Sequence, residues 1–206
     1  TDVAVGVPGF ANVGCPITRG GSFRLNFSDD HSGKVFDAAN GCDWTQKLPT
    51  LVAQSHPDLA LFSGGVMDTV PRKLAVLGPG WHTIDEPAFQ DAMRSEYEAA
   101  VDAVVGASPS TKVVLLTVSP DWKRGNATHA ERVDLINHVI EQVAADRPGV
   151  TEIVDLKGWI DGTGERQRLC PDGLHLMPAT TGKEVFERFL GPRLAQVLSG
   201  AVLARH

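Results

Sequence analysis

Long apolar runs, blocks of like charge and cysteine are all scarce or missing in this chain of 206 residues. No apolar run approaches the ~20 residues that a helix needs to cross a bilayer. No secretory signal peptide is visible, and the chain begins with Thr1 instead of methionine. We therefore expect a processed or excised piece of a longer protein, whose attachment to a membrane this stretch leaves open.

The balance of charge is acidic. The chain carries 25 Asp and Glu against 19 Lys and Arg, for a formal net charge of -6, and its basic residues are scattered. This distribution argues against a nucleic-acid surface, which gathers basic residues on one face. The sequence contains no repeat or low-complexity tract, and its length suits one domain with a full core. We expect residues 1–206 to form a single domain with no nucleic-acid partner.

The three cysteines are Cys15, Cys42 and Cys170. Their spacing matches no zinc pattern. Cys15 and Cys42 lie in two loop-like stretches and are able to pair, which leaves Cys170 odd. One disulfide is the interpretation we favour, and it indicates an exported domain. Three free thiols in a reducing cytosol are the alternative, and the count of cysteines does not decide between them.

Apolar periodicity predicts strands that alternate with helices. Buried parallel strands are expected at 57–65, 112–117 and 150–156, after a short opening strand at 2–10. Helices are expected at 86–106, 130–146 and 180–198, and Asp43 is able to cap another. The stretches 11–41 and 70–86 are expected to be loops, the first with a hairpin near 22–27. This alternation predicts an α/β fold with a parallel sheet covered by helices on both faces.

In such sheets ligands bind beyond the carboxyl ends of the strands. The turns after strands are therefore where a site is expected, at 6–10, 64–68, 118–122 and 170–175. In the last turn Asp172 and His175 are three residues apart, and Pro171 and Gly173 keep the segment from being a plain helix. A carboxylate that orients an imidazole forms the base half of a hydrolase triad. A polar loop pair in which the Asp only caps a turn is the alternative.

Two glycines at strand exits, Gly9 and Gly65, are candidates for an oxyanion hole. Glycine allows a backbone N–H to come close to a developing oxyanion. A tight strand exit without a catalytic role is the alternative for both.

The order of these blocks resembles the SGNH (GDSL-like) hydrolase superfamily over essentially the whole chain. Val5-Gly6-Val7-Pro8-Gly9 is similar to the second family block, Gly65-Val66-Met67-Asp68 to the third (Gly-x-Asn-Asp), and Asp172-Gly173-Leu174-His175 to the last. Cys42-Asp43-Trp44 and Asp85-Glu86-Pro87-Ala88-Phe89 resemble the SGNH domains fused to actinobacterial membrane acyltransferases of family 3 type.

The resemblance implies a three-layer α/β/α sandwich with a mainly parallel, flavodoxin-like central sheet. It also implies a Ser-His-Asp mechanism without a metal or organic cofactor. In that scheme His175 is the general base, Asp172 orients it, and Gly9 and Gly65 supply backbone N–H groups to the oxyanion.

Two departures from the family pattern bear on catalysis. Met67 stands where the third block has Asn, and a thioether cannot donate a hydrogen bond. No Gly-Asp-Ser occurs anywhere in the chain, so the usual nucleophile block and its central strand are missing. The parent protein carries that strand upstream in the explanation we favour. Otherwise Ser22 or Ser63 serves, or the domain only binds.

The expected function is that of an extracytoplasmic esterase or O-acyltransferase acting on acyl esters of cell-envelope glycans or glycolipids. A membrane acyltransferase domain in the parent protein is the expected partner. The rival is a non-catalytic module that binds or presents envelope carbohydrate, favoured by the missing serine and by Met67. A nucleotide or receiver domain is disfavoured, because no glycine-rich phosphate loop joins a strand to a helix.

Overall fold

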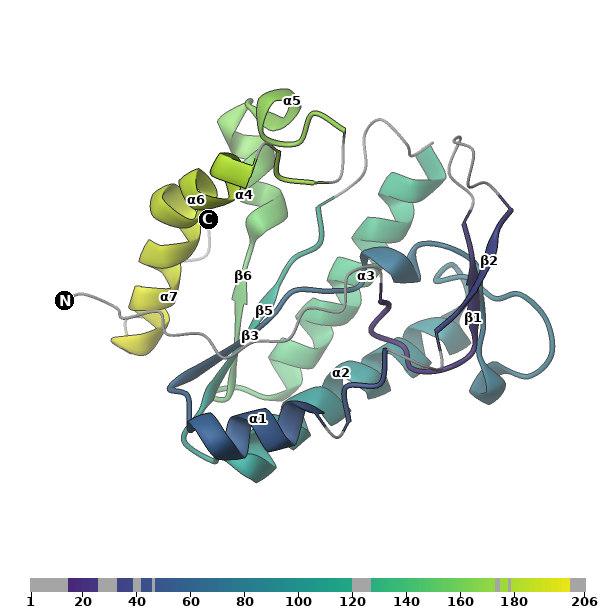
Figure 1. The fold of residues 1–206 in the computed structure, drawn as a ribbon, viewed down its shortest axis with the longest axis horizontal. Coiled ribbons are helices and arrows are strands. Elements are labelled where there is room, and N and C mark those ends of the chain that lie inside the picture. The colour runs from purple at the N-terminus through teal and green to yellow at the C-terminus, as the bar shows by residue number, and fades with distance from the viewer. Residues whose placement is uncertain are drawn as a thin grey trace.

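The computed structural model describes residues 15–25, 33–38, 42–45, 47–119, 127–172, 175–177 and 179–200. Its centre is a parallel sheet of β3 (Leu59–Phe62), β5 (Lys112–Leu116) and β6 (Thr151–Val154), in the order β3-β5-β6 (Figure 1). The register pairs Leu59 with Lys112 and Val113 with Thr151. All three strands lie inside the runs from which the sequence predicted them. The expected opening strand at 2–10 lies outside the described residues.

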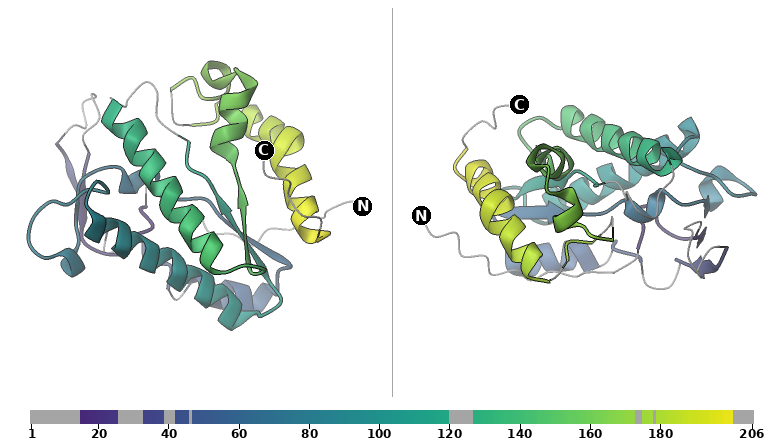
Figure 2. Two further views of the ribbon diagram at one scale, coloured as in Figure 1. Left: turned by 180° about the vertical axis from the view of Figure 1, so that it is seen from behind. Right: turned by 90° about the horizontal axis from the view of Figure 1, so that it is seen from above.

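One face of the sheet is covered by α2 (Pro87–Ala107) and α3 (Ala127–Asp146) (Figure 2). Both helices are amphipathic, and their apolar stripes pack on Val113 and Leu115 of β5. Pro87 begins α2 at a position where its missing N–H costs no hydrogen bond. Helix α1 (Lys47–Ser55) packs against α2, and its Leu48 and Val52 join the same core.

The other face is covered by the closing helical run, which comprises α6 (Ala179–Val185), the π-helical segment η3 (Phe186–Leu190) and α7 (Gly191–Leu198). Phe189 and Val197 pack there on Val114 and Leu116 of β5 and on Val154 of β6. Helices on both faces of a parallel sheet make the three-layer α/β/α sandwich that the sequence predicted. The sequence predicted one uninterrupted helix at 180–198, and the π-helical segment interrupts it.

Two short helices were not predicted: α4 (Leu156–Thr163) and α5 (Arg166–Leu169). Asp155 begins α4, because its side chain accepts a hydrogen bond from the backbone N–H of Gly158 at 2.9 Å. Gly164 ends α4 in the left-handed conformation. Both helices are too short to produce a recognisable apolar period.

A second, antiparallel sheet stands at the end of the molecule away from α6 and α7 (Figure 1). It contains β1 (Ser22–Arg24), β2 (Val35–Asp37) and β4 (Arg72–Lys73), in the order β2-β1-β4. Strand β1 falls in the expected hairpin near 22–27, whereas its partner β2 lies farther along the chain than that prediction placed it. Strand β4 was missed, because two residues carry no period, and the stretch 70–86 was wrongly predicted to be loop throughout. That stretch also contains the short 3-10 turn η2 (Ala75–Leu77).

Strand β3 is less covered than the sequence predicted. Leu61 keeps 39 % of its surface exposed, whereas Val113 and Val114 in β5 are fully buried. Among the described strands only β5 pairs with β3, so its other edge has no partner within the described ranges. A run as apolar as Leu-Ala-Leu-Phe is typical of a strand with neighbours on both edges. The prediction that β3 is buried is therefore wrong for the residues the structure describes.

Within the described part of the chain, none of the helices is both long and apolar enough to cross a bilayer.

Candidate functional site

The structure brings Asp172 and His175 into direct contact. Asp172 Oδ1 accepts a hydrogen bond from the backbone N–H of His175 at 2.8 Å, and Oδ2 lies 2.7 Å from the ring Nδ1. The imidazole is 59 % exposed. This arrangement fixes the ring by one nitrogen and keeps it accessible to a second reactant. It is the geometry that the base half of a triad requires, and the catalytic roles of both residues remain predictions.

The turn that carries this pair is anchored at both of its ends. The backbone N–H of Met177 donates to the carbonyl of Leu169 at 3.1 Å, which closes the neck of the turn. Leu169 and Cys170 on one side of the turn and Leu176 on the other pack in a cluster with Ile160 and Val185. The hydrogen bond across the base of the turn and the apolar contacts on both of its sides restrict the turn to one conformation. The Asp172 and His175 side chains are therefore held in a fixed orientation.

Four charged side chains form a network beside this turn, two from residues that precede it in the sequence and two from residues that follow it. Arg168 of α5 binds Glu184 of α6 through two hydrogen bonds of 2.7 and 2.8 Å, and it also contacts Glu165. Arg188 joins the same two carboxylates. Hydrogen bonds from Arg168 and Arg188 lower the pKa of Glu184 to about 2 and also lower the pKa of Glu165. The network therefore ties α5 to the closing helical run beside the Asp172–His175 turn.

Cys170 is the one free cysteine, and it is buried next to this turn. Burial raises the pKa of its thiol, against the opposing charge of Arg166, and the charge of Asp172 raises the pKa further. A thiol kept protonated is a poor nucleophile. Despite its place beside Asp172, Cys170 is a core residue and not a substitute for the missing serine.

The second candidate turn begins at Gly65, after β3. Its φ of 98° lies in the left-handed region, and the 3-10 turn η1 (Val66–Asp68) follows. A Cβ at this position would come within 3.1 to 3.3 Å of Tyr97, Ile136 and Met93. Both observations require glycine here. The Tyr97 hydroxyl also donates to the carbonyl of Gly64 at 3.3 Å, so the strand exit is fixed by a side chain of α2.

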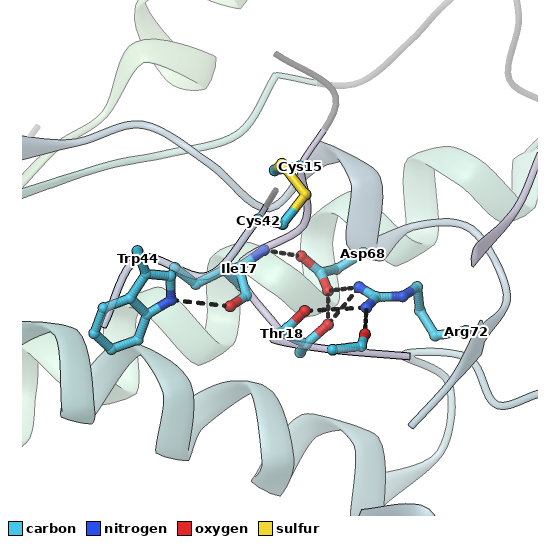
Figure 3. The surroundings of a disulfide bond; sticks show 8 residues. Cys15, Ile17, Thr18, Cys42, Trp44, Asp68 and Arg72 are labelled. Carbon is cyan, nitrogen blue, oxygen red and sulfur yellow. Dashed lines mark hydrogen bonds and ion pairs between the residues drawn. A yellow bond between two sulfur atoms is a disulfide. The ribbon is translucent and has the colours of Figure 1, made fainter. Parts of the chain in front are cut away.

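A buried ion pair holds the other end of this turn (Figure 3). Asp68 and Arg72 are both fully buried, and Arg72 Nη1 lies 3.1 Å from Asp68 Oδ1. The backbone N–H of Ile17 donates to Asp68 at 2.7 Å, and the hydroxyl of Thr18 donates to it as well. Arg72 also donates to Thr18 Oγ1 at 2.6 Å and to the carbonyl of Gly20 at 2.8 Å. These bonds attach the segment 15–20 to the Gly65 turn.

Burial raises the pKa of Asp68, while Arg72, Thr18 and Ile17 oppose the rise. Burial likewise lowers the pKa of Arg72, and the charge of Asp68 opposes that change. Each charged group thus depends on the other to remain charged in the core.

The structure joins Cys15 and Cys42 in a disulfide, with their Cα atoms 5.3 Å apart (Figure 3). Met67 packs in the apolar cluster that this disulfide shares with Phe23 and Val70. At the position where the family has the Asn donor, this chain therefore directs a thioether toward an apolar cluster.

The carboxyl ends of β5 and β6 are also tied together. The Thr117 hydroxyl donates to Asp155 Oδ1 at 2.9 Å, and Arg166 donates to Ser119 Oγ at 2.7 Å. Gly65 follows the carboxyl end of β3 directly, whereas Asp172 comes after β6 and the two short helices α4 and α5 that continue from it. Among the described residues no group of three His, Cys, Asp or Glu side chains is placed to hold a metal ion.

The remaining candidates from the sequence are the two serines and the glycine of the second family block. Ser63 is exposed before Gly64, and Ser22 begins β1 in the second sheet. Gly9 lies outside the described residues, as do Gly173 and Leu174 of the Asp172–His175 turn. The sequence analysis missed Arg72, Thr18 and the Tyr97 hydroxyl. Tyr97 is the only tyrosine of the chain, and its position on an apolar stripe was the one available signal of a buried hydroxyl.

Comparison with solved structures identifies similar folds. One is an acetyl esterase mutant with acetate ion, at a TM-score of 0.53 and 18 % identity, covering 78 % of this chain and 68 % of that one. Another is a carbohydrate esterase of family 3 from Talaromyces cellulolyticus, at a TM-score of 0.52 and 18 % identity, with the same coverage of 78 % and 68 %. A peptidoglycan O-acetylesterase aligns at 0.47 and 15 % identity over 79 % of this chain and 46 % of its own.

No curated protein matches the chain by sequence. The sequence profile of the GDSL-like lipase/acylhydrolase family matches residues 22–181, which is most of the chain. The three-layer sandwich described above is also the fold of the two esterase structures with the higher TM-scores. The chain therefore belongs to the GDSL-like lipase/acylhydrolase family, the esterases of SGNH type.

Proposed function

We propose that this chain is an esterase or O-acyltransferase domain for acyl esters of cell-envelope glycans or glycolipids. The observation that carries the proposal is the double contact of His175 with Asp172, at 2.7 Å through the ring and 2.8 Å through the backbone. The acetyl esterase and the carbohydrate esterase that share the fold support a carbohydrate ester as the substrate class.

His175 is the general base in this proposal. The Asp172 carboxylate accepts a hydrogen bond from Nδ1–H, which sets the tautomer and leaves Nε2 free to accept a proton. Nε2 takes the proton of a serine hydroxyl while the serine oxygen bonds to the acyl carbon. It then gives that proton to the alkoxide that leaves as the ester C–O bond breaks. Water or a glycan hydroxyl next attacks the acyl-serine with His175 again as base, which gives hydrolysis or transfer.

The oxyanion of the tetrahedral intermediate is bound by backbone N–H groups of Gly65 and Gly9. Gly65 is suited to this role because its backbone is left-handed and three neighbouring side chains leave little room for a Cβ there. Met67 contributes no donor. Losing one donor of an oxyanion hole typically slows acyl transfer about a hundred- to a thousandfold, so we expect a slow esterase toward small activated esters.

We propose that the nucleophilic serine comes from a strand added along the edge of β3. The support is the exposure of Leu61 and the absence of a second partner for β3 among the described strands. A parallel strand at that edge would end beside Gly65, because carboxyl ends of parallel strands meet at one edge. A longer form of this chain would carry a Gly-Asp-Ser turn at the end of that strand.

A fluorophosphonate probe with peptide mapping tests this assignment on the chain as it stands and on a form extended upstream. We expect the extended form alone to be labelled, at a serine in a Gly-Asp-Ser turn. A label on Ser22 or Ser63 would place the nucleophile inside this chain and overturn the added strand. If neither form is labelled, the esterase proposal fails.

Substitution of His175 tests its role as the base, in whichever form of the protein reacts with the fluorophosphonate probe. We expect His175→Ala to lower esterase kcat by about a thousandfold or more, as loss of a triad base does. His138→Ala is the control, because this exposed histidine pairs with Gln142 and Glu141 on α3. Unchanged activity in His175→Ala would exclude His175 as the base.

The proposed location is the extracytoplasmic side of the membrane, in a parent protein that carries a membrane acyltransferase domain. The Cys15–Cys42 disulfide supports an oxidising compartment, where such bonds form and persist. Fractionation of cells expressing the full-length parent, with thiol labelling before and after reduction, tests the location. Recovery of both thiols in reduced form from the native source would contradict it.

The rival proposal is a module that binds envelope carbohydrate without catalysis. The packing of the partly buried Met67 against the disulfide cluster favours it, because a side-chain oxyanion donor is lacking there. Glycan binding that survives His175→Ala, together with no esterase activity in the extended form, would support the rival.

A further inference from the structure

The outer face of the small antiparallel sheet carries an arrangement that the esterase chemistry does not use. Phe23 in β1 is buried against the core, so its neighbours Ser22 and Arg24 project from the opposite face. The register pairs Ser22 with Lys73 of β4 and Arg24 with Val35 of β2. Directly paired residues share a face. The register also pairs Ser22 with Asp37 of β2. Arg24, Lys73, Ser22, Val35 and Asp37 therefore form one surface, which we call the outer face.

Trp81 completes this surface. Arg72 of β4 exchanges two backbone hydrogen bonds of 2.8 Å with His82, which places the preceding Trp81 beside Lys73. The guanidinium carbon of Arg24 lies 4.9 Å from the centroid of the indole ring, and Lys73 Nζ lies 5.0 Å from it. Two cations from two different strands thus converge on one aromatic ring.

Neither cation has a carboxylate partner among the ion pairs of the described residues. Other arginines of this end of the molecule do, since Arg19 pairs with Glu96 and Arg72 with Asp68. Two like charges near one another repel, and an indole offsets only part of that cost. The chain as a whole carries a net charge of -6. A local pair of cations in an acidic protein is therefore a specific place for an anion rather than part of a general basic surface.

We propose that the outer face binds an acidic saccharide chain through Arg24, Lys73 and Trp81. The anionic group is inferred from the paired cations, because a guanidinium binds a carboxylate through two parallel hydrogen bonds. The saccharide is inferred from the flat aromatic and aliphatic surface of Trp81 and Val35, which suits the C–H face of a sugar ring. This choice of a sugar rests on the proposed function.

The position of the outer face fits a polymeric substrate. Strand β4 begins at Arg72, which is bonded to Asp68 at the end of the Gly65 turn. The backbone between them is short, and Arg132 of α3 holds it by donating to the carbonyl of Thr69 at 3.0 Å. The outer face and the Gly65 turn are thereby connected through a short, fixed piece of backbone, as a long substrate in contact with both would require.

Calorimetric titration with oligogalacturonate, a carboxylated sugar oligomer, tests the proposal without any turnover. Its methyl ester is the matched ligand, because the sugar rings are the same and the charge is removed. We expect binding of the acid form that weakens as salt is raised, and at least about tenfold weaker binding of the ester. Equal binding of both forms would overturn the anionic part of the proposal.

The protein variants give the second arm of the experiment. We expect Arg24→Gln combined with Lys73→Gln, and separately Trp81→Ala, to lower affinity about tenfold or more. Lys183→Gln is the control, because this lysine is exposed on α6 and pairs with Glu187. If Lys183→Gln lowered the affinity for oligogalacturonate as much, the effect would come from the net charge of the protein and the proposed site would be wrong. Matching thermal transitions verify that each variant is folded.

The outcomes for the outer face and for the esterase site are separable. Fluorophosphonate labelling in the extended form with no oligogalacturonate binding would refute only the outer face. Binding to vesicles of phosphatidylglycerol, without binding to the oligosaccharide, would also refute it in favour of a lipid surface. Oligosaccharide binding that depends on Arg24 and Lys73 would support the outer face whether or not the serine probe reacts.

Discussion

Asp68 and Arg72 form an ion pair in which both side chains are fully buried, one helical turn apart in the sequence. The pair joins three segments, because Asp68 belongs to the turn after β3, Arg72 begins β4, and both bind Thr18. The main α/β sandwich and the small antiparallel sheet are therefore connected through one polar network. The Gly65 turn lies inside that connection.

We expect Asp68→Asn to destabilise the protein by about 3 to 5 kcal/mol, because it leaves the Arg72 guanidinium buried without a counter-charge. Urea unfolding followed by circular dichroism measures the change. Asp68→Leu combined with Arg72→Met should cost less than Asp68→Asn, because it removes both charges. Arg94→Gln is the surface control, since Arg94 pairs with Glu98 and Asp146 in solvent, and its effect should be much smaller. A cost of Asp68→Asn no larger than the control would contradict the buried pair.

Gly65→Ala should destabilise the chain by about 1 to 3 kcal/mol, because alanine must adopt a φ of 98° against tight side-chain contacts. Gly64→Ala is a matched control one residue earlier, where an added Cβ meets nothing within 4 Å. In the form that reacts with the serine probe, Gly65→Ala should also slow labelling more than Gly64→Ala. Equal effects of the two substitutions would argue against a special role for the Gly65 backbone.

Removing the disulfide should lower stability by about 3 to 4 kcal/mol. Cys15 and Cys42 are 27 residues apart in the sequence, and the entropy of closing a loop of this length gives that estimate. The measurement is the free energy of unfolding of Cys15→Ser combined with Cys42→Ser, compared with that of the oxidised native chain. A reducing agent should lower the stability of Cys170→Ala as much as it lowers that of the native chain, because Cys170 is the free cysteine and takes no part in the disulfide. If a reducing agent left the stability of the native chain unchanged, this prediction would be wrong.

The ion network beside the Asp172–His175 turn should contribute stability that depends on pH. The pKa of Glu184 is lowered from 4.5 to about 2 by its hydrogen bonds to Arg168 and Arg188. A carboxylate with a lowered folded-state pKa stabilises the fold above its unfolded pKa, and this stabilisation is lost as the pH falls toward the folded value. The native chain should therefore exceed Glu184→Gln in melting temperature at neutral pH, by a margin that shrinks between about pH 4.5 and 2.

Salt provides the check on that interpretation. The four charged groups are partly exposed, so the margin between the native chain and Glu184→Gln should shrink in high salt at neutral pH. A margin that is independent of both pH and salt would show that Glu184 acts through packing instead of charge.

Prediction from sequence was most successful where the pattern is local and repeated. The stripe from Phe89 to Val104 predicted α2 to within a residue at each end, because every buried position recurs at steps of three and four. The three strands of the main sheet were found for a similar reason. Strand β4 and helices α4 and α5 were missed, since a segment of two to eight residues has too few positions to show a period.

The sequence by itself determined the fold class, the parallel sheet and the pairing of Asp172 with His175, because these follow from apolar periods and from spacing within one turn. Only the tertiary structure decided which distant residues meet. The partnership of Asp68 with Thr18, the contact of Tyr97 with Gly64, and the convergence of Arg24 and Lys73 on Trp81 join segments far apart in the chain. The physical reason is that side-chain partnerships across a core depend on the packing of whole elements, which no local window of sequence contains.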